Sequence, residues 1–168
     1  MEDRVGRIMG QWQVERPDLD VTPQGVMGRL HRLADRLRDE LVAEYVHHGL
    51  GEGEFDVLAA LRRIGDPYEL APGELARHTM VTTGAMSKRI DRLEESGLVT
   101  RRTSVGDRRG RVVGLTPAGR AVIDEAFTAH IANEHRLVAP LTDEERADLE
   151  RLLARWLEAL EGPDLVSR

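Results

Sequence analysis

Apolar residues recur at helical spacing over most of the chain, and this pattern predicts a mainly helical fold. The first stripe consists of Val5, Ile8, Met9 and Trp12. It predicts a short amphipathic helix that ends before Pro17, because proline cannot continue a helix.

Longer stripes predict the rest of the helical framework. Thr22 is a suitable N-cap for the second helix, with proline at the first helical position. Thr142 and Glu145 form a capping box for the last helix, which carries leucines up to Leu160. The helices between these two ends are expected over residues 23–48, 54–64 and 117–137.

The segment 72–97 has a different pattern, that of two short helices joined by a turn. The first is expected over residues 74–79, where the small side chain of Ala76 allows close approach of its partner. The second begins at Thr82 or Thr83, both good N-caps, and runs to residue 96.

The second helix of this pair carries its own core stripe. Met86, Ile90 and Leu93 recur at i, i+4 and i+7, which is the spacing of one buried helical face. Gly97 ends the helix, since glycine adopts the left-handed conformation most easily.

A basic hairpin is expected directly after this helix pair. Residues 98–104 and 110–116 are rich in β-branched side chains, and a Gly-Asp pair lies between them. Arginines crowd the tip, where the negative potential of a narrow DNA minor groove would favour them. Asp107 is placed to orient Arg109 through a bidentate ion pair.

The hairpin resembles the wing of the MarR family. Asp107, Arg109 and the Leu115-Thr116 pair match its D-x-R-x(5)-L-T signature. The resemblance implies a homodimeric winged helix-turn-helix regulator. The second helix of the 72–97 pair would lie in the major groove, and the wing arginine in the minor groove. The alternative is an unrelated basic hairpin beside an unrelated helix pair.

The resemblance and the basic pattern together give a set of expected DNA contacts. These lie on the second helix of the 72–97 pair or on the hairpin: Thr82, Thr83, Ser87, Lys88, Arg92, Arg101, Arg108, Arg109 and Arg111. The expected partner is a pseudo-palindromic double-stranded operator.

The charge distribution supports this interpretation, although the net charge of −6 is unusual for a DNA-binding protein. Residues 77–111 carry nine lysines and arginines against four acids, whereas the rest of the chain has a net charge of −11. Local charge neutralises phosphates, so an acidic remainder limits indiscriminate binding.

Several classes of protein are disfavoured by what the sequence lacks. There is no cysteine, no signal peptide and no apolar run near the roughly 20 residues of a membrane span, so we expect a cytoplasmic protein without disulfides. No nucleophile, base and orienting group occur together, and no glycine-rich phosphate loop is present, so we expect no enzyme, cofactor or catalytic residue. The histidines lack ligand spacing, so no metal site is expected.

The chain is expected to form a single domain with three regions. Residues 1–50 supply dimerisation and ligand-binding helices, 51–116 the winged helix-turn-helix, and 117–168 further dimerisation helices. Long apolar stripes at both ends exceed what one core can bury, which favours a two-fold homodimer. The alternative is that the terminal helices only cover their own core.

A possible sensing site involves Arg89, at the border of the buried stripe, and Asp56, which is set among apolar residues. A partly buried guanidinium needs an anion, so the two can pair. The pattern also resembles the urate-responsive branch of the MarR family, in which Trp12, Asp56, Arg89 and Arg101 have counterparts.

This second resemblance implies a small organic anion between the N-terminal helix and the DNA-binding region. Urate, citrate or trans-aconitate, and phenolic acids are the expected effectors, and Arg16 is placed to assist a polycarboxylate. The predicted function is a repressor that such an anion releases from its promoter. The alternatives are a purely structural ion pair in a regulator without a ligand, or a winged-helix protein-interaction module.

Overall fold

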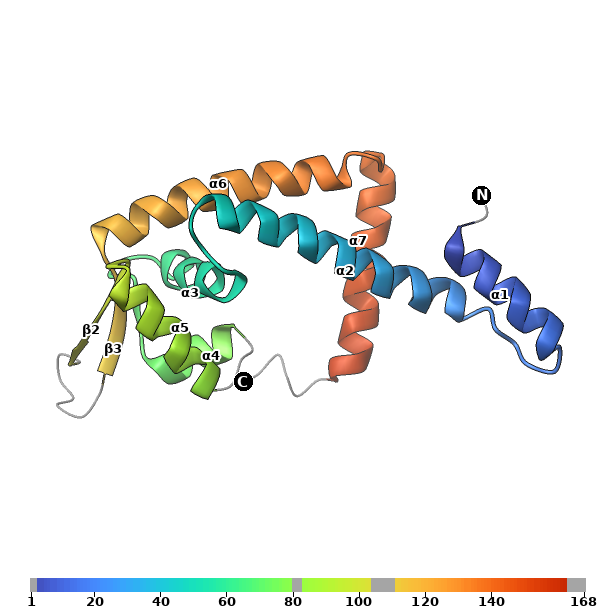
Figure 1. The fold of residues 1–168 in the computed structure, drawn as a ribbon, viewed down its shortest axis with the longest axis horizontal. Helices are drawn as coiled ribbons and strands as arrows, with labels where there is room; N and C mark the ends of the chain where they lie inside the picture. The colour runs from blue at the N-terminus through green and yellow to red at the C-terminus, as the bar shows by residue number, and fades with distance from the viewer. Residues whose placement is uncertain (1–2, 80–82, 104–110, 163–168) are drawn as a thin grey trace. The chain divides into compact units, whose positions relative to one another are not determined.

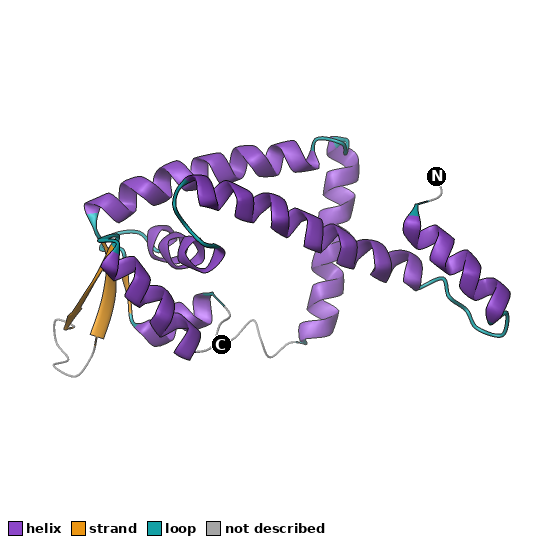
Figure 2. Cartoon of the chain, in the orientation of Figure 1, coloured by secondary structure: helices purple, strands orange, loops and turns teal. Residues whose placement is uncertain are grey.

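The computed structural model describes residues 3–79, 83–103 and 111–162 of the chain. The turn before the second helix of the pair, the hairpin tip, Thr82, Asp107, Arg108 and Arg109 therefore lie outside the described residues. Figures 1 and 2 show a mainly helical chain with one small sheet. The elements are α1 (Arg4–Glu15), α2 (Gln24–His47), α3 (Glu52–Arg63), β1 (Glu69–Leu70), α4 (Pro72–His78), α5 (Thr83–Glu95), β2 (Val99–Thr103), β3 (Arg111–Leu115), α6 (Pro117–Val138) and α7 (Asp143–Glu161).

The chain divides into two compact units, Met1–His130 and Ile131–Arg168, and each is described separately. All the predicted helices are present, with ends within about two residues of those expected from capping and stripe length. One cap differs from the prediction. Pro23, not Thr22, occupies the N-cap of α2, and no side chain caps this end of the helix. The backbone N–H of Thr22 donates to the Asp20 carboxylate at 3.0 Å.

In the first unit, α1 packs against the beginning of α2. Val5 is buried there, with its methyl groups against the bare backbone of Gly28. Asp3 caps α1 by accepting from the N–H of Gly6, and its carboxylate also accepts both Nε and Nη2 of Arg29. The other end of α2 contacts α3, where the Tyr45 ring stacks on Phe55 at 4.0 Å between centroids.

The core of this unit lies where α3, α4, α5 and the sheet meet. The predicted stripe of Met86, Ile90 and Leu93 is confirmed, since all three side chains are almost completely buried. Gly97 follows α5 with a φ of +70°, as predicted from its left-handed preference. This burial fixes which side of α5 faces inward, and thereby which side faces away.

The predicted hairpin is confirmed as β2 and β3, but a third strand joins it. The sheet order is β1-β3-β2, and Glu69 of β1 pairs with Gly114 of β3. A strand of two residues is too short to leave an alternating pattern in the sequence, so β1 was not predicted.

In the second unit, α7 begins as predicted at a capping box between Thr142 and Glu145. None of its residues is buried. Its apolar stripe instead stands exposed: Leu149, Leu152, Leu153, Leu157 and Leu160.

Candidate nucleic-acid interface and effector site

Helix α5 presents a polar outer side, opposite its buried stripe. Gly84, Ser87, Lys88 and Asp91 are exposed along this side. Of the predicted DNA contacts, Ser87 and Lys88 therefore lie on the accessible surface of the helix. Thr83 is the first residue of α5, and Thr82, the other predicted N-cap, lies outside the described residues.

The edge of α5 that faces α3 is held by two ion pairs, and we call it the α3 edge. The guanidinium Nη1 of Arg89 lies 3.5 Å from Oδ2 of Asp56. One turn further along, Nε of Arg92 donates to Oε1 of Glu54 at 2.6 Å. The Arg89 pair was predicted. Arg92, a predicted DNA contact, is paired with Glu54 in this structure, and its side chain remains 60% exposed.

Arg89 is the more enclosed of the two arginines on this edge. Its side chain is 21% exposed, and its Nη1 atom is buried without a hydrogen-bond partner among the described residues. Its guanidinium lies against Gly53, where a Cβ atom would come within 2.2 Å of Nε. A buried guanidinium atom without a hydrogen bond is a place where an added anion would be stabilised.

Asp56 is the acid that faces Arg89. Burial raises the pKa of the Asp56 carboxyl above its ordinary value, and nearby Glu52 raises the pKa further, whereas Arg89 and Arg63 oppose the shift. The Asp56 side chain remains 41% exposed, so its loss of hydration is partial, yet this loss raises the pKa more than the attraction of Arg89 lowers it.

The opposite edge of α5 faces β2, and we call it the β2 edge. Here Arg101 binds two acids of the helix: Nη1 donates to Glu94 at 2.8 Å and Nη2 to Asp91 at 2.5 Å. The backbone N–H of Arg101 also donates to Glu94, and Nη2 lies 3.4 Å from the carbonyl oxygen of Ser87. Hydrogen bonding to Asp91 raises the pKa of Arg101, as expected for a paired guanidinium.

The remaining wing residues are only partly described. Arg111 is exposed at the start of β3, opposite Thr103. Arg102 pairs with Glu69 of β1, across β3. The predicted contacts Arg108, Arg109 and Thr82 lie outside the described residues.

The structure does not bring Trp12 and Arg16 to the Arg89–Asp56 pair within one chain. Both belong to the end of α1, which packs on the beginning of α2, whereas the pair lies between α3 and α5. Trp12 is 47% exposed, and Arg16 is engaged with Asp18 through two bonds of 2.7 and 2.6 Å.

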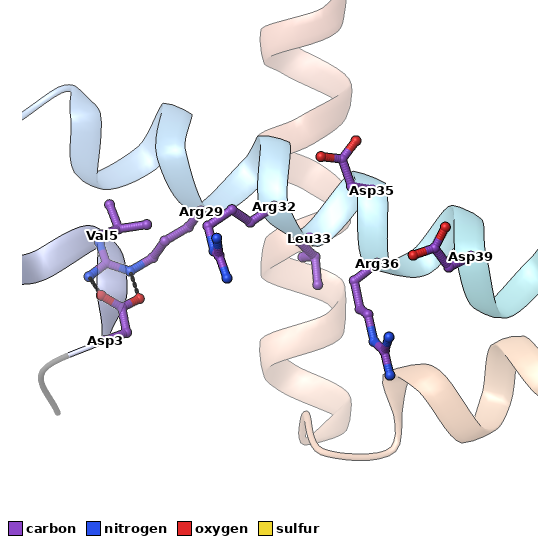
Figure 3. A pocket seen from close by; sticks show the side chains of 8 residues that line it. All are labelled: Asp3, Val5, Arg29, Arg32, Leu33, Asp35, Arg36 and Asp39. Atoms are coloured by element: carbon purple, nitrogen blue, oxygen red, sulfur yellow. Dashed lines mark hydrogen bonds and ion pairs between the residues drawn. The ribbon is translucent and has the colours of Figure 1, made fainter. Parts of the chain in front are cut away.

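A groove does lie beside α1, as Figure 3 shows, with a volume of about 590 Å³. Its rim mixes acids and arginines of α1 and α2: Asp3, Arg29, Arg32, Asp35, Arg36 and Asp39. Arg29 points at Asp3 and is neutralised by it (Figure 3). Because opposite charges alternate around it, this groove offers no concentrated positive charge for an anion.

The comparisons with known proteins decide the family. A model described as the MarR family matches residues 48–110. The transcriptional regulator PecS of Dickeya dadantii is 40% identical over 154 residues, which cover 90% of this chain and 91% of PecS. The chain belongs to the MarR family.

Solved MarR-family structures resemble the whole winged helix-turn-helix. A MarR variant of Escherichia coli crystallised with operator DNA has a TM-score of 0.70 and 28% identity, covering 82% of this chain and 95% of that one. Rv2887 of Mycobacterium tuberculosis, crystallised with p-aminosalicylic acid, has a TM-score of 0.60 and 34% identity, covering 76% and 94% respectively.

Membership of the MarR family makes this chain a DNA-binding transcriptional regulator and not an enzyme. The alternative of an unrelated basic hairpin is thereby wrong. No helix in the described part of the chain is long and apolar enough to cross a membrane.

Sequence reasoning missed three participants in the site. Glu54 and Gly53 lie at the start of α3, and Glu94 lies on α5, where it accepts from Arg101. A sequence shows that such residues exist, but the partner of each is set by how α3 and β2 pack against α5. The capping role of Glu54, which accepts the N–H of Gly51 at 2.7 Å, was the one local feature that marked it.

Proposed function

We propose that this MarR-family protein is a repressor that a small organic anion releases from its operator by binding at Arg89. The observation that carries the proposal is the buried Nη1 atom of Arg89, which has no hydrogen-bond partner among the described residues and lies 3.5 Å from the carboxylate of Asp56. A carboxylate or urate anion would supply the missing acceptor.

The proposed mechanism follows from where Arg89 is attached. An anion bound to Arg89 stands close to Asp56, and like charges in a poorly hydrated place repel each other. The contact between α3 and α5 then changes, and α5 carries the outer side that faces DNA. The anion must bind the DNA-free form more tightly than the DNA-bound form, since that difference is all it can use to shift the equilibrium.

In this proposal the protein binds its operator as a homodimer. Two copies of α5 about one helical turn apart, roughly 34 Å, fit a pseudo-palindromic operator. Ser87 and Lys88 lie on the exposed side of α5, and Arg111 stands at the base of the wing. We assign Arg109 to the minor groove, as the family signature implies, and retain Arg108 as a further DNA contact of the wing.

The chemistry of the effector is that of a compact carboxylate or urate. The relative Rv2887 was crystallised with p-aminosalicylic acid, a phenolic acid. Urate, citrate, trans-aconitate and salicylate are therefore the four anions to test. Trp12 and Arg16 join the site through dimer assembly in this proposal, because one chain keeps them apart from Arg89.

The test is release of operator DNA, measured by fluorescence anisotropy with each of the four anions. We expect one of them to release the unaltered protein, and Arg89→Ala to lose that response. Asp56→Asn is expected to weaken DNA binding without any anion, because it removes the same contact. If Arg89→Ala is released normally, the Arg89–Asp56 pair is structural and the site lies elsewhere.

A second readout addresses Trp12. With Trp156 replaced by phenylalanine, Trp12 is the remaining tryptophan and its fluorescence is expected to change on anion binding. An unchanged spectrum during release of DNA would remove Trp12 from the site. Failure of all four anions to release DNA would favour a regulator without a small-molecule effector.

A further inference from the structure

Arg101 was expected to contact DNA, but its guanidinium is already occupied. Asp91 and Glu94 each accept from a different Nη atom, and the side chain is only 26% exposed. Both acids belong to α5 and lie three residues apart, so they form one acidic row beside β2. The planar fork of arginine matches this arrangement, with one N–H group for each carboxylate.

The contact links two parts of the DNA-binding device. Arg101 is the third residue of β2, the strand that leads into the wing, and it pairs with Val113 of β3. Its backbone N–H also donates to Glu94 at 3.1 Å. The side chain and the main chain of one residue therefore both attach the base of the wing to the same helix.

We propose that Arg101 is a positioning residue that fixes the wing relative to the recognition helix, and that its role in DNA binding is indirect. DNA is read correctly only when α5 and the wing reach adjacent grooves together. A residue that sets their spacing affects recognition of the correct sequence more than attraction to phosphate in general.

This inference rests on the DNA binding of the MarR family and is independent of the proposed effector, so its test contains no anion. The operator is a duplex selected from a random pool by the unaltered protein. Affinity for this duplex and for an unrelated duplex is measured over a range of salt concentrations. The ratio of the two affinities and the slope of each salt titration are the readouts.

Three variants separate positioning from direct contact. Arg101→Gln removes the guanidinium, and Arg101→Lys keeps the charge but not the fork. Asp91→Asn with Glu94→Gln leaves Arg101 intact and removes the negative charges of its two partners. We expect each to reduce the specific-to-unrelated ratio by about tenfold or more, with salt slopes unchanged within about half a unit.

A direct phosphate contact would give opposite results. Arg101→Lys would then retain affinity, and Arg101→Gln would lower the salt slope by about 1 for both duplexes. Removing the two acids would strengthen binding to the operator, because it frees Arg101 and removes negative charge from α5. Any one of these three outcomes overturns the proposal.

A matched control tests for general destabilisation. Arg62→Gln breaks an exposed ion pair with Asp124, between α3 and α6, away from the recognition helix. We expect this variant to keep the affinity ratio of the unaltered protein. An equal loss in Arg62→Gln would show that loss of any surface ion pair suffices, and would also overturn the assignment of Arg101.

Discussion

The guanidinium of Arg89 lies directly against the backbone of Gly53, in the space that a side chain at residue 53 would occupy. A Cβ atom there would be 2.2 Å from Nε and 2.4 Å from Cζ of Arg89. Gly53 lies inside α3, where glycine is normally unfavourable relative to alanine by roughly 0.5–1 kcal/mol. The absence of a side chain at this position is therefore what allows Arg89 to reach Asp56.

Gly53→Ala is expected to displace Arg89 while keeping the fold. The clashing atoms are the far end of a long side chain, which can turn away, and alanine favours the helix. We expect thermal unfolding to remain cooperative, with the anion response of DNA binding lost as in Arg89→Ala.

The control for this variant is Gly73→Ala in α4, where an added Cβ atom meets nothing within 4 Å. It is expected to retain both DNA binding and release. A normal anion response in Gly53→Ala would mean that the observed position of Arg89 is unimportant for sensing.

Features of α5 that depend on local sequence could be predicted without the structure. The spacing of Met86, Ile90 and Leu93 was sufficient to predict the buried side of α5, because helical periodicity is local. The pairing of Arg89 with Asp56 was also predicted, since Arg89 borders the buried stripe and Asp56 is set among apolar residues.

The ion-pair partners of Arg92 and Arg101 were harder to predict. Arg92 and Arg101 look like DNA-binding arginines because both are basic residues in or beside the recognition helix. Their partners Glu54 and Glu94 are determined by how α3 and β2 pack against α5. Composition gives no information about whether an arginine is already neutralised by such a neighbour.

The raised pKa of Asp56 predicts a particular dependence of stability on pH. Between the unfolded and folded pKa values of this carboxyl, the folded protein holds more protons than the unfolded chain. The stability contributed by Asp56 is thus fully present below its unfolded pKa and is lost as the pH rises through its folded pKa. Urea unfolding of the unaltered protein and of Asp56→Asn should show the former gaining stability relative to the variant as the pH falls through this window.

Asp18→Asn provides the control of opposite sign. A hydrogen bond from Arg16 lowers the pKa of Asp18, so its contribution is present above the unfolded pKa and is lost as the pH falls through the folded pKa. A difference curve for Asp56 with the same sign as that for Asp18 would contradict the desolvated state of Asp56.

The exposed stripe of α7 predicts that the second unit takes part in dimerisation. Leu153 and Leu157 line an apolar crevice with Val138, yet both remain substantially exposed. Replacing both with glutamate should yield a folded monomer in sedimentation experiments, because charge prevents burial of this face in a dimer. Deleting residues 141–168 is expected to have the same effect on assembly.

Arg155→Ala is the control for α7, since it changes an exposed residue outside the leucine stripe. It should sediment as the unaltered protein does. An intact, soluble dimer after deletion of residues 141–168 would exclude α7 from the interface.

The wing arginine gives the most direct prediction for DNA binding. Arg109 matches the arginine of the family's D-x-R signature and is assigned to the minor groove. Arg109→Ala should weaken operator binding by about 1–3 kcal/mol, because a guanidinium in a narrow groove gains from the concentrated negative potential. Anisotropy titrations at fixed salt would measure the loss.

Arg7→Ala is the control, because it removes the same charge from α1, outside the DNA-reading segment. If the two variants lose affinity equally, net charge alone accounts for the effect and the wing arginine has no specific role.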